Sequence, residues 1–169
     1  YNYNSHYDIA ELGDCIDYVV IMCYDEHYAG GEEGSVASID YVKRGISEAT
    51  SAMDSDRVII ALPFYTRVWI TGADGKTHSE ALSVQTAESW VAQKGVELQW
   101  QEDLGQNYGE ITEDNEVKKI WMEDDASMQK KVDAVKAAGC GGVAGWKLGQ
   151  EPESFWSILN LNSDAATQG

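Results

Sequence analysis

Three short, nearly continuous apolar segments constrain the fold of this chain most strongly. They cover residues 17–24, 57–62 and 142–146, and none of them alternates between apolar and polar residues. Continuous hydrophobicity over so few residues is typical of parallel strands that are covered on both faces. We therefore expect these segments to be buried parallel strands.

Segments with helical spacing lie between the predicted strands. Apolar residues recur at spacings of three and four over residues 39–53 and again over 128–135, which predicts two amphipathic helices. Asp124 precedes the second helix and Gly139 follows it, as start and stop signals do. A last short helix is expected after Pro152. The order helix, strand, helix, strand, insertion, helix, strand, helix predicts an α/β fold with a parallel sheet.

The insertion is inferred from the spacing of the strands. The second and third apolar segments are separated by some 45 residues more than the first and second. The extra residues contain one helical pattern, over 83–94, and three short strand patterns. These strand patterns cover residues 97–101, 108–112 and 117–122. We expect a small α+β insertion after the carboxyl end of a strand, where α/β folds build their ligand sites.

Composition excludes several kinds of partner. The chain of 169 residues has 12 Lys and Arg against 29 Asp and Glu, a net charge of −17. Such an excess repels phosphate backbones and anionic lipid surfaces, so we expect no nucleic-acid partner and no membrane-surface partner. No apolar run approaches the ~20 residues that cross a bilayer. The three cysteines and three histidines lack metal-ligand spacing, and no metal site is predicted.

The aromatic residues favour a ligand that is partly polar. Six Trp and nine Tyr stand against two Phe. Trp and Tyr combine a flat apolar face with a polar group, which suits sugars, although protein interfaces and ordinary cores also use them. Composition by itself therefore leaves carbohydrate binding as one hypothesis among three.

Each predicted strand delivers aromatic residues at its carboxyl end. The sequences at these three carboxyl ends are Met22-Cys23-Tyr24-Asp25, Pro63-Phe64-Tyr65-Thr66-Arg67-Val68-Trp69 and Gly145-Trp146-Lys147-Leu148-Gly149. Because the carboxyl ends of parallel strands meet at one edge of a sheet, we expect these side chains to gather there.

These strand-end segments resemble motifs of glycoside hydrolase family 18, the family of chitinases and spore-cortex peptidoglycan N-acetylglucosaminidases. Met22-x-Tyr24-Asp25 resembles the family's Met-x-Tyr-Asp motif, and residues 63–69 are similar to its Pro-Phe-Tyr-Gly-Arg-x-Trp segment, with Thr66 in place of Gly. Residues 142–149 resemble the segment that bears a substrate-stacking Trp. The resemblance implies a partial TIM (β/α)8 barrel with the three segments as its sixth to eighth strands. The expected division is barrel units over 1–69, insertion over 70–120, and the last helix, strand, helix and tail over 121–169.

The resemblance also implies an activity and a set of site residues. The family hydrolyses β-1,4-linked N-acetylglucosamine glycans by substrate-assisted retaining catalysis, without a metal or organic cofactor. Tyr24 and Asp25 are then catalytic positions that hold the acetamido group and a sugar hydroxyl. The substrate-binding positions are Met22, Tyr65, Arg67 and Trp146. The alternatives are structural: Tyr24 as a rim aromatic, Asp25 as a turn cap, Arg67 as an ion-pair partner and Trp146 as a core residue.

One family motif is missing from the chain. The proton-donating Glu of the family lies in Asp-x-x-Asp-x-Asp-x-Glu, and this spacing does not occur in the sequence. We therefore expect the chain to be the C-terminal half of such a domain, inactive by itself, with that Glu upstream. The unclosed barrel is expected to pair with its missing N-terminal half or to self-associate. An extracellular, cell-wall or spore location follows from the resemblance. A non-catalytic glycan-binding relative of the same fold and an unrelated acidic interaction domain remain as alternatives.

Overall fold

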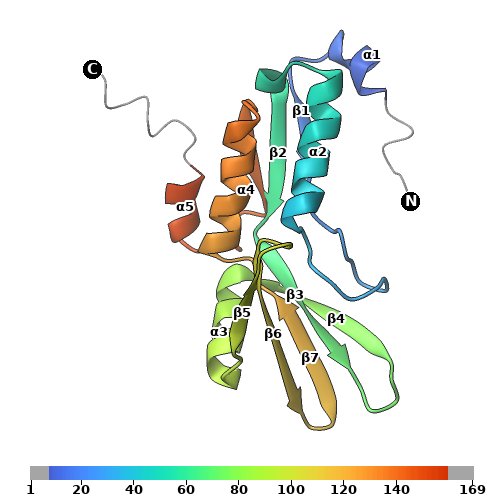
Figure 1. Ribbon diagram of the computed structural model, residues 1–169, viewed down its shortest axis with the longest axis vertical. Coiled ribbons are helices and arrows are strands. Elements are labelled where there is room, and N and C mark those ends of the chain that lie inside the picture. The colour runs from blue at the N-terminus through green and yellow to red at the C-terminus, as the bar shows by residue number, and fades with distance from the viewer. Residues whose placement is uncertain (1–7, 160–169) are drawn as a thin grey trace.

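Two β-sheets lie end to end along the long axis of the molecule (Figure 1). The computed structural model describes residues 8–159, so the outermost parts of the predicted first and last divisions lie outside it. The strands are β1 (Val19–Met22), β2 (Val58–Pro63), β3 (Tyr65–Thr71), β4 (Thr77–Ser83), β5 (Leu98–Gln101), β6 (Gln106–Glu113), β7 (Glu116–Trp121) and β8 (Gly142–Trp146). The helices are α1 (Ile9–Gly13), α2 (Ile39–Ala52), α3 (Val84–Lys94), α4 (Asp125–Ala137) and α5 (Ser154–Ile158), with a 3-10 turn at Ser55–Arg57.

The first sheet confirms the predicted parallel strands. Its order is β1-β2-β8, and both neighbours run parallel to the central β2. Val19 lies opposite Val58, and Pro63 lies opposite Trp146, so the carboxyl ends of β2 and β8 are level. The order of helices and strands along the chain is the predicted one, and the fold is α/β.

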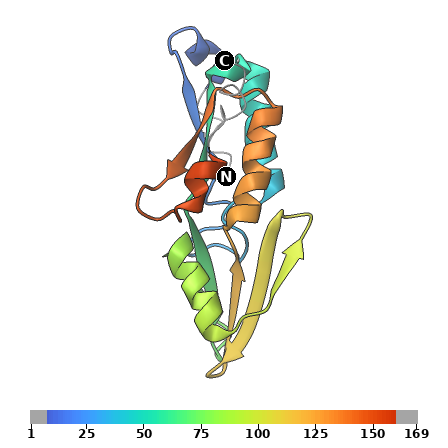
Figure 2. The same ribbon diagram turned by 90° about the vertical axis from the view of Figure 1, so that its left-hand side faces the viewer.

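Helices cover one face of this sheet. α2 and α4 flank β2, and α5 packs beside α4 (Figures 1 and 2). Val58, Ile60 and Leu62 of β2 are completely buried in the core that these helices form with the sheet. Val19 and Ile21 of β1 pack against the same core. Alternate residues of each strand therefore point toward the helices, and the rest point to the opposite face.

The helix ends follow from local capping. The Ser38 side chain accepts a hydrogen bond from the Tyr41 amide at the start of α2. Asp124 and Ser127 form a reciprocal capping box at the start of α4, which confirms the predicted helix start. Gly95 ends α3 in the left-handed conformation (φ 62°), as its position after Lys94 predicts.

The second sheet is antiparallel and corresponds to the predicted insertion. Its order is β4-β3-β7-β6-β5, with α3 packed on one face through Ala87. The helix and the three strands predicted between residues 83 and 122 are confirmed. The hairpin of β3 and β4 was not predicted. β4 is mostly exposed and polar, so it lacks apolar alternation, and β3 follows β2 with only Phe64 between them. The sheet begins at Tyr65, ahead of the expected division at residue 70.

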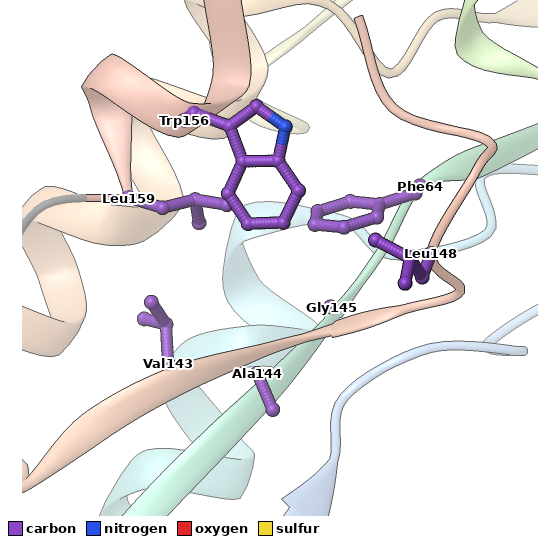
Figure 3. Close-up of a pocket in the computed structure, with 7 residues that line it drawn as sticks. All are labelled: Phe64, Val143, Ala144, Gly145, Leu148, Trp156 and Leu159. Carbon is purple, nitrogen blue, oxygen red and sulfur yellow. The ribbon is translucent and has the colours of Figure 1, made fainter. Parts of the chain in front are cut away.

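The parallel sheet is open at both edges among the described residues. β1 and β8 each pair with β2 alone, and no strand closes the sheet into a barrel between residues 8 and 159. Val20, Met22 and Trp146, on the face turned away from the helices, are largely exposed. Beside the edge of β8, an apolar pocket of about 360 Å³ opens between the strand and α5 (Figure 3). Its lining residues are Phe64, Val143, Ala144, Gly145, Leu148, Trp156 and Leu159.

These open edges lead to a prediction about association. Sedimentation velocity of the 169-residue chain should show species heavier than the monomer, in proportions that rise with concentration, because unpaired strand edges next to apolar surface attract further strands. Val20→Lys should shift the distribution toward the monomer, because it places a charge on the uncovered face. Ala73→Lys, in the exposed β3–β4 turn, is the matched control. A monomer at every concentration in the unmodified chain contradicts the prediction.

None of the helices in this described part of the chain is long and apolar enough to cross a membrane.

Candidate active site

The ends of the three parallel strands bring an aromatic cluster together. Tyr24 follows β1, and its ring stacks on Trp146 at the end of β8, with the ring centroids 6.2 Å apart and the planes inclined by 20°. Tyr65, the first residue of β3, meets Tyr24 edge-on at 6.4 Å. Trp146 is 53% exposed, so it is not part of the core that the described residues form. The cluster therefore presents an indole face to solvent beside two phenol groups.

Asp25 joins the cluster through Tyr65. The Tyr65 hydroxyl donates a hydrogen bond to Asp25 Oδ1. Asp25 adopts the left-handed backbone conformation (φ 58°), which is uncommon for a residue with a side chain and is concentrated at functional sites. Burial and the hydrogen bond to Asp25 raise the pKa of the Tyr65 hydroxyl. Burial and the nearby Asp25 charge likewise raise the pKa of Tyr24, so both phenols stay protonated as donors at neutral pH.

Backbone contacts hold the strand ends together. The Phe64 amide donates to the Trp146 carbonyl oxygen at 2.6 Å, which joins the exit of β2 to the end of β8. The Val84 amide at the start of α3 lies 3.2 Å from the Phe64 carbonyl oxygen and 3.1 Å from that of Gln150. The insertion is thereby tied to the parallel sheet at the edge where the aromatic cluster lies.

Met22 and Arg67 each lie two residues along the chain from a tyrosine of this cluster. Met22 ends β1 two residues before Tyr24, and its side chain is 66% exposed. Arg67 lies two residues after Tyr65 on β3 and donates from Nη1 to Ser79 Oγ at 3.3 Å. Its Nε is buried and has no hydrogen-bond partner among the described residues, and no acidic group in residues 8–159 forms an ion pair with it. The Arg67 Nε thus has an unmet hydrogen-bonding requirement among the described residues.

The segment that follows Asp25 rests on the five-stranded sheet. The Trp69 indole Nε1 donates to the Gly34 carbonyl oxygen at 2.8 Å, and Lys119 forms an ion pair with Glu33. A side chain at Gly34 would put its Cβ 2.5 Å from the His27 ring, so glycine allows the segment to fold back on itself here. One residue of β3 and one of β7 therefore hold the segment between Tyr24 and α2.

The acidic residues before α4 have two different roles. Asp124 caps the helix, as the sequence predicts. Glu123 is instead completely buried and forms an ion pair with Lys131, which is also completely buried. Burial raises the pKa of the Glu123 carboxyl, and the Lys131 ammonium opposes this rise. This pair was not predicted from the sequence, nor were the buried Gln106 and Ser35 that extend it. The available signal was Lys131 itself, which falls on the apolar stripe of α4 between Met128 and Val135.

No group of three or more His, Cys, Asp and Glu residues in the described part of the chain is arranged to hold a metal ion.

Comparison with known proteins identifies the family. A family model described as glycosyl hydrolases family 18 matches residues 1–151. The chain belongs to glycosyl hydrolase family 18. Among the relatives of this family 18 chain, the cortical fragment-lytic enzyme of Bacillus subtilis is 28% identical over 160 residues, covering 94% of the chain and 37% of the enzyme.

Two solved structures show the likeness of the fold. The spore cortex-lytic enzyme SleL of Bacillus cereus matches with a TM-score of 0.83 at 25% identity over 92% of the chain and 37% of the enzyme. A chitinase of Chromobacterium violaceum matches with a TM-score of 0.83 at 24% identity, over 92% of the chain and 48% of the chitinase. The family 18 chain thus spans less than half the length of these proteins.

Proposed function

We propose that the chain is the C-terminal part of a glycosidase that hydrolyses β-1,4-linked N-acetylglucosamine glycans, either peptidoglycan or chitin. One observation carries the proposal: Tyr24, Asp25, Tyr65 and Trp146 form one cluster at the ends of three parallel strands. A half-exposed indole suits the apolar face of a sugar ring, and phenol and carboxylate groups beside it suit its polar substituents. Family membership supports this assignment.

In the proposed reaction the substrate supplies its own nucleophile. The acetamido oxygen attacks the anomeric carbon while an enzymic carboxylic acid protonates the leaving oxygen, and water then completes hydrolysis with retention of configuration. Tyr24 would donate a hydrogen bond to the acetamido group and hold it in the attacking position. Asp25 would accept a hydrogen bond from a sugar hydroxyl. Trp146 would lie under the reacting ring, and Met22, Tyr65 and Arg67 would line the same subsite.

The proton donor is proposed to lie upstream of this chain. The sequence has no Asp-x-x-Asp-x-Asp-x-Glu motif, and the chain covers 34–44% of the curated relatives that it matches. The same upstream part would supply strands for the open edges of β1 and β8 and fill the apolar pocket beside β8. We propose a partial TIM barrel for this chain, completed by that part.

The location of the protein is proposed from its relatives. A cortical fragment-lytic enzyme and the spore cortex-lytic enzyme SleL are among them. We propose an extracellular, cell-wall or spore location, where peptidoglycan is within reach.

A non-catalytic glycan-binding protein is the second candidate. The observation in its favour is that this chain contains the aromatic cluster but not the Asp-x-x-Asp-x-Asp-x-Glu motif. Such a protein would bind the same glycans without cleaving them. Release of reducing ends from peptidoglycan or chitin by the longer protein that carries this chain separates the two candidates.

Binding through Trp146 gives a direct test of the proposed site. In the longer protein, Trp146→Ala should weaken the binding of N-acetylglucosamine oligosaccharides about tenfold or more, since a lost stacking contact of ~1.4 kcal/mol is a factor of ten. Titration calorimetry measures this change. Trp100→Ala is the matched control, because Trp100 is 40% exposed but lies on β5, the edge strand of the antiparallel sheet. Equal affinities for the Trp146→Ala variant and the unmodified protein would contradict the assignment.

A further inference from the structure

A chain of completely buried polar groups crosses the molecule close to the candidate site. Lys131 Nζ on α4 lies 2.5 Å from both carboxylate oxygens of Glu123. Gln106 Nε2, at the start of β6, donates to Glu123 Oε1 at 2.7 Å and to the Met122 carbonyl oxygen at 3.2 Å. Gln106 Oε1 accepts a hydrogen bond from Ser35 Oγ. The side chains of Lys131, Glu123 and Gln106 are 0% exposed, and Ser35 is 3% exposed.

The ion pair and the Met122 carbonyl oxygen together set the direction of the hydrogen bonds in this chain of groups. A carboxylate only accepts hydrogen bonds, so Glu123 turns the amide nitrogen of Gln106 toward itself. The amide oxygen of Gln106 then points at Ser35 and makes the Ser35 hydroxyl a donor. Ser35 Oγ is left free to accept from the Ala37 amide, 3.0 Å away. One arrangement of donors and acceptors is thereby selected over its reverse.

Ser35 is in turn connected to the backbone next to Asp25. The Ser35 carbonyl oxygen accepts from the His27 amide at 3.2 Å, and the neighbouring Val36 carbonyl oxygen accepts from the Glu26 amide at 2.9 Å. These two bonds hold the residues directly after Asp25. Asp25 keeps its left-handed conformation between them and the hydrogen bond from Tyr65.

We propose that Ser35 and Gln106, oriented by the buried Glu123–Lys131 ion pair, are positioning residues that fix the backbone at Asp25 and thereby hold Tyr24 and Asp25 in the geometry of the site. This inference rests on the proposed function for its effect on catalysis. Its structural part, the ordering of residues 26–37, is independent of any activity.

The cost of the ion pair supports a positioning role. Removing two charges from water offsets much of their attraction, so a buried ion pair adds little net stability compared with apolar residues of the same size. What it provides here is a fixed donor and acceptor pattern that reaches from α4 through β6 to the site. An apolar substitute could fill the same volume but would leave the longer hydrogen bond to the Met122 carbonyl oxygen as the one remaining bond from the Gln106 amide nitrogen among the described residues.

The test compares two buried serines that contact opposite ends of the same network. Ser35→Ala, in the longer protein, removes the link between Gln106 and the segment after Asp25. Ser127→Ala is the matched control, because Ser127 is also completely buried and donates to Glu123 Oε2 at 2.8 Å, but has no contact with that segment. Gln106→Met is a second variant that breaks the same link from the other side.

Three measurements decide the outcome. Ser35→Ala and Gln106→Met should lower kcat about ten- to a hundredfold with little change in KM, because small displacements of positioned groups cost that much in rate. Both should also raise amide hydrogen exchange over residues 26–37 at least tenfold. Ser127→Ala should lower the melting temperature yet leave kcat and this exchange unchanged.

The inference is overturned if Ser35→Ala leaves exchange over residues 26–37 unchanged, or if all three variants lose kcat in proportion to their loss of melting temperature. The proposed function fails separately, if the unmodified longer protein releases no product from peptidoglycan or chitin. In that case the exchange measurements still decide whether Ser35 and Gln106 order the segment.

Discussion

Tyr24→Phe in the longer protein should lower kcat on N-acetylglucosamine glycans about 10²–10³-fold, the effect typical of removing one hydrogen-bond donor from the reacting group. The phenylalanine ring keeps the stack on Trp146 and the edge contact with Tyr65, so substrate binding should change little. The raised pKa of Tyr24 keeps its hydroxyl a donor across the neutral range, and the loss should be the same from pH 6 to pH 8. Initial rates on a defined oligosaccharide measure kcat and KM separately.

Tyr18→Phe is the control for this experiment. Tyr18 loses the same hydroxyl but lies just before β1, at the end opposite to the aromatic cluster, and is largely exposed. The kcat of the Tyr18→Phe variant should equal that of the unmodified protein. If Tyr24→Phe retains more than half of the normal kcat, Tyr24 does not hold the acetamido group, and the proposed mechanism loses its positioning donor.

The second large effect concerns the chain by itself. We expect the 169-residue chain to release no measurable product from peptidoglycan or chitin, because the proposed proton donor lies upstream of it. General acid assistance contributes about 10²–10⁴-fold in rate, and the missing strands add to the loss. Reducing-end assays at equal molar concentration of the chain and the longer protein measure the difference.

Two comparisons separate the effect of the proposed proton donor from the effect of the proposed upstream strands. The longer protein with its proposed upstream Glu replaced by Gln should bind oligosaccharides normally but hydrolyse about 10²–10⁴-fold more slowly. The chain alone should fail in both binding and hydrolysis if the upstream strands also shape the subsite. Hydrolysis by the chain alone within tenfold of the longer protein would show that the proton donor lies within residues 1–169.

The uncovered face of the parallel sheet explains why stability and activity are expected to depend on the same proposed upstream part. Val20, Met22 and Trp146 point away from the helices and are largely exposed in this chain. The same face ends at the aromatic cluster. A partner that covers Val20 would therefore lie next to the substrate subsite, and its removal would expose apolar surface and open the site together.

The sequence by itself determined the parallel strands, the helices between them and the residues at the strand ends. Continuous apolar runs, helical spacing and capping residues are local signals, and each reports the burial or the backbone conformation of the residues that carry it. The helix of residues 83–94 and the start of α4 at Asp124 were predicted for this reason. Tyr24, Asp25, Tyr65 and Trp146 were named because their segments resemble motifs of glycoside hydrolase family 18, and their contact in space agrees with the expectation that strand ends meet.

Only the tertiary structure decided the rest. β4 has no apolar alternation and is a strand because it pairs with β3. Lys131 falls on the apolar stripe of α4, but the sequence does not show which groups pair with it there: Glu123, Gln106 and Ser35 come from three other parts of the chain. Pairing between distant residues leaves no periodic trace in the sequence, because either partner alone is compatible with many environments. The open edges of β1 and β8 are likewise a property of the assembled sheet.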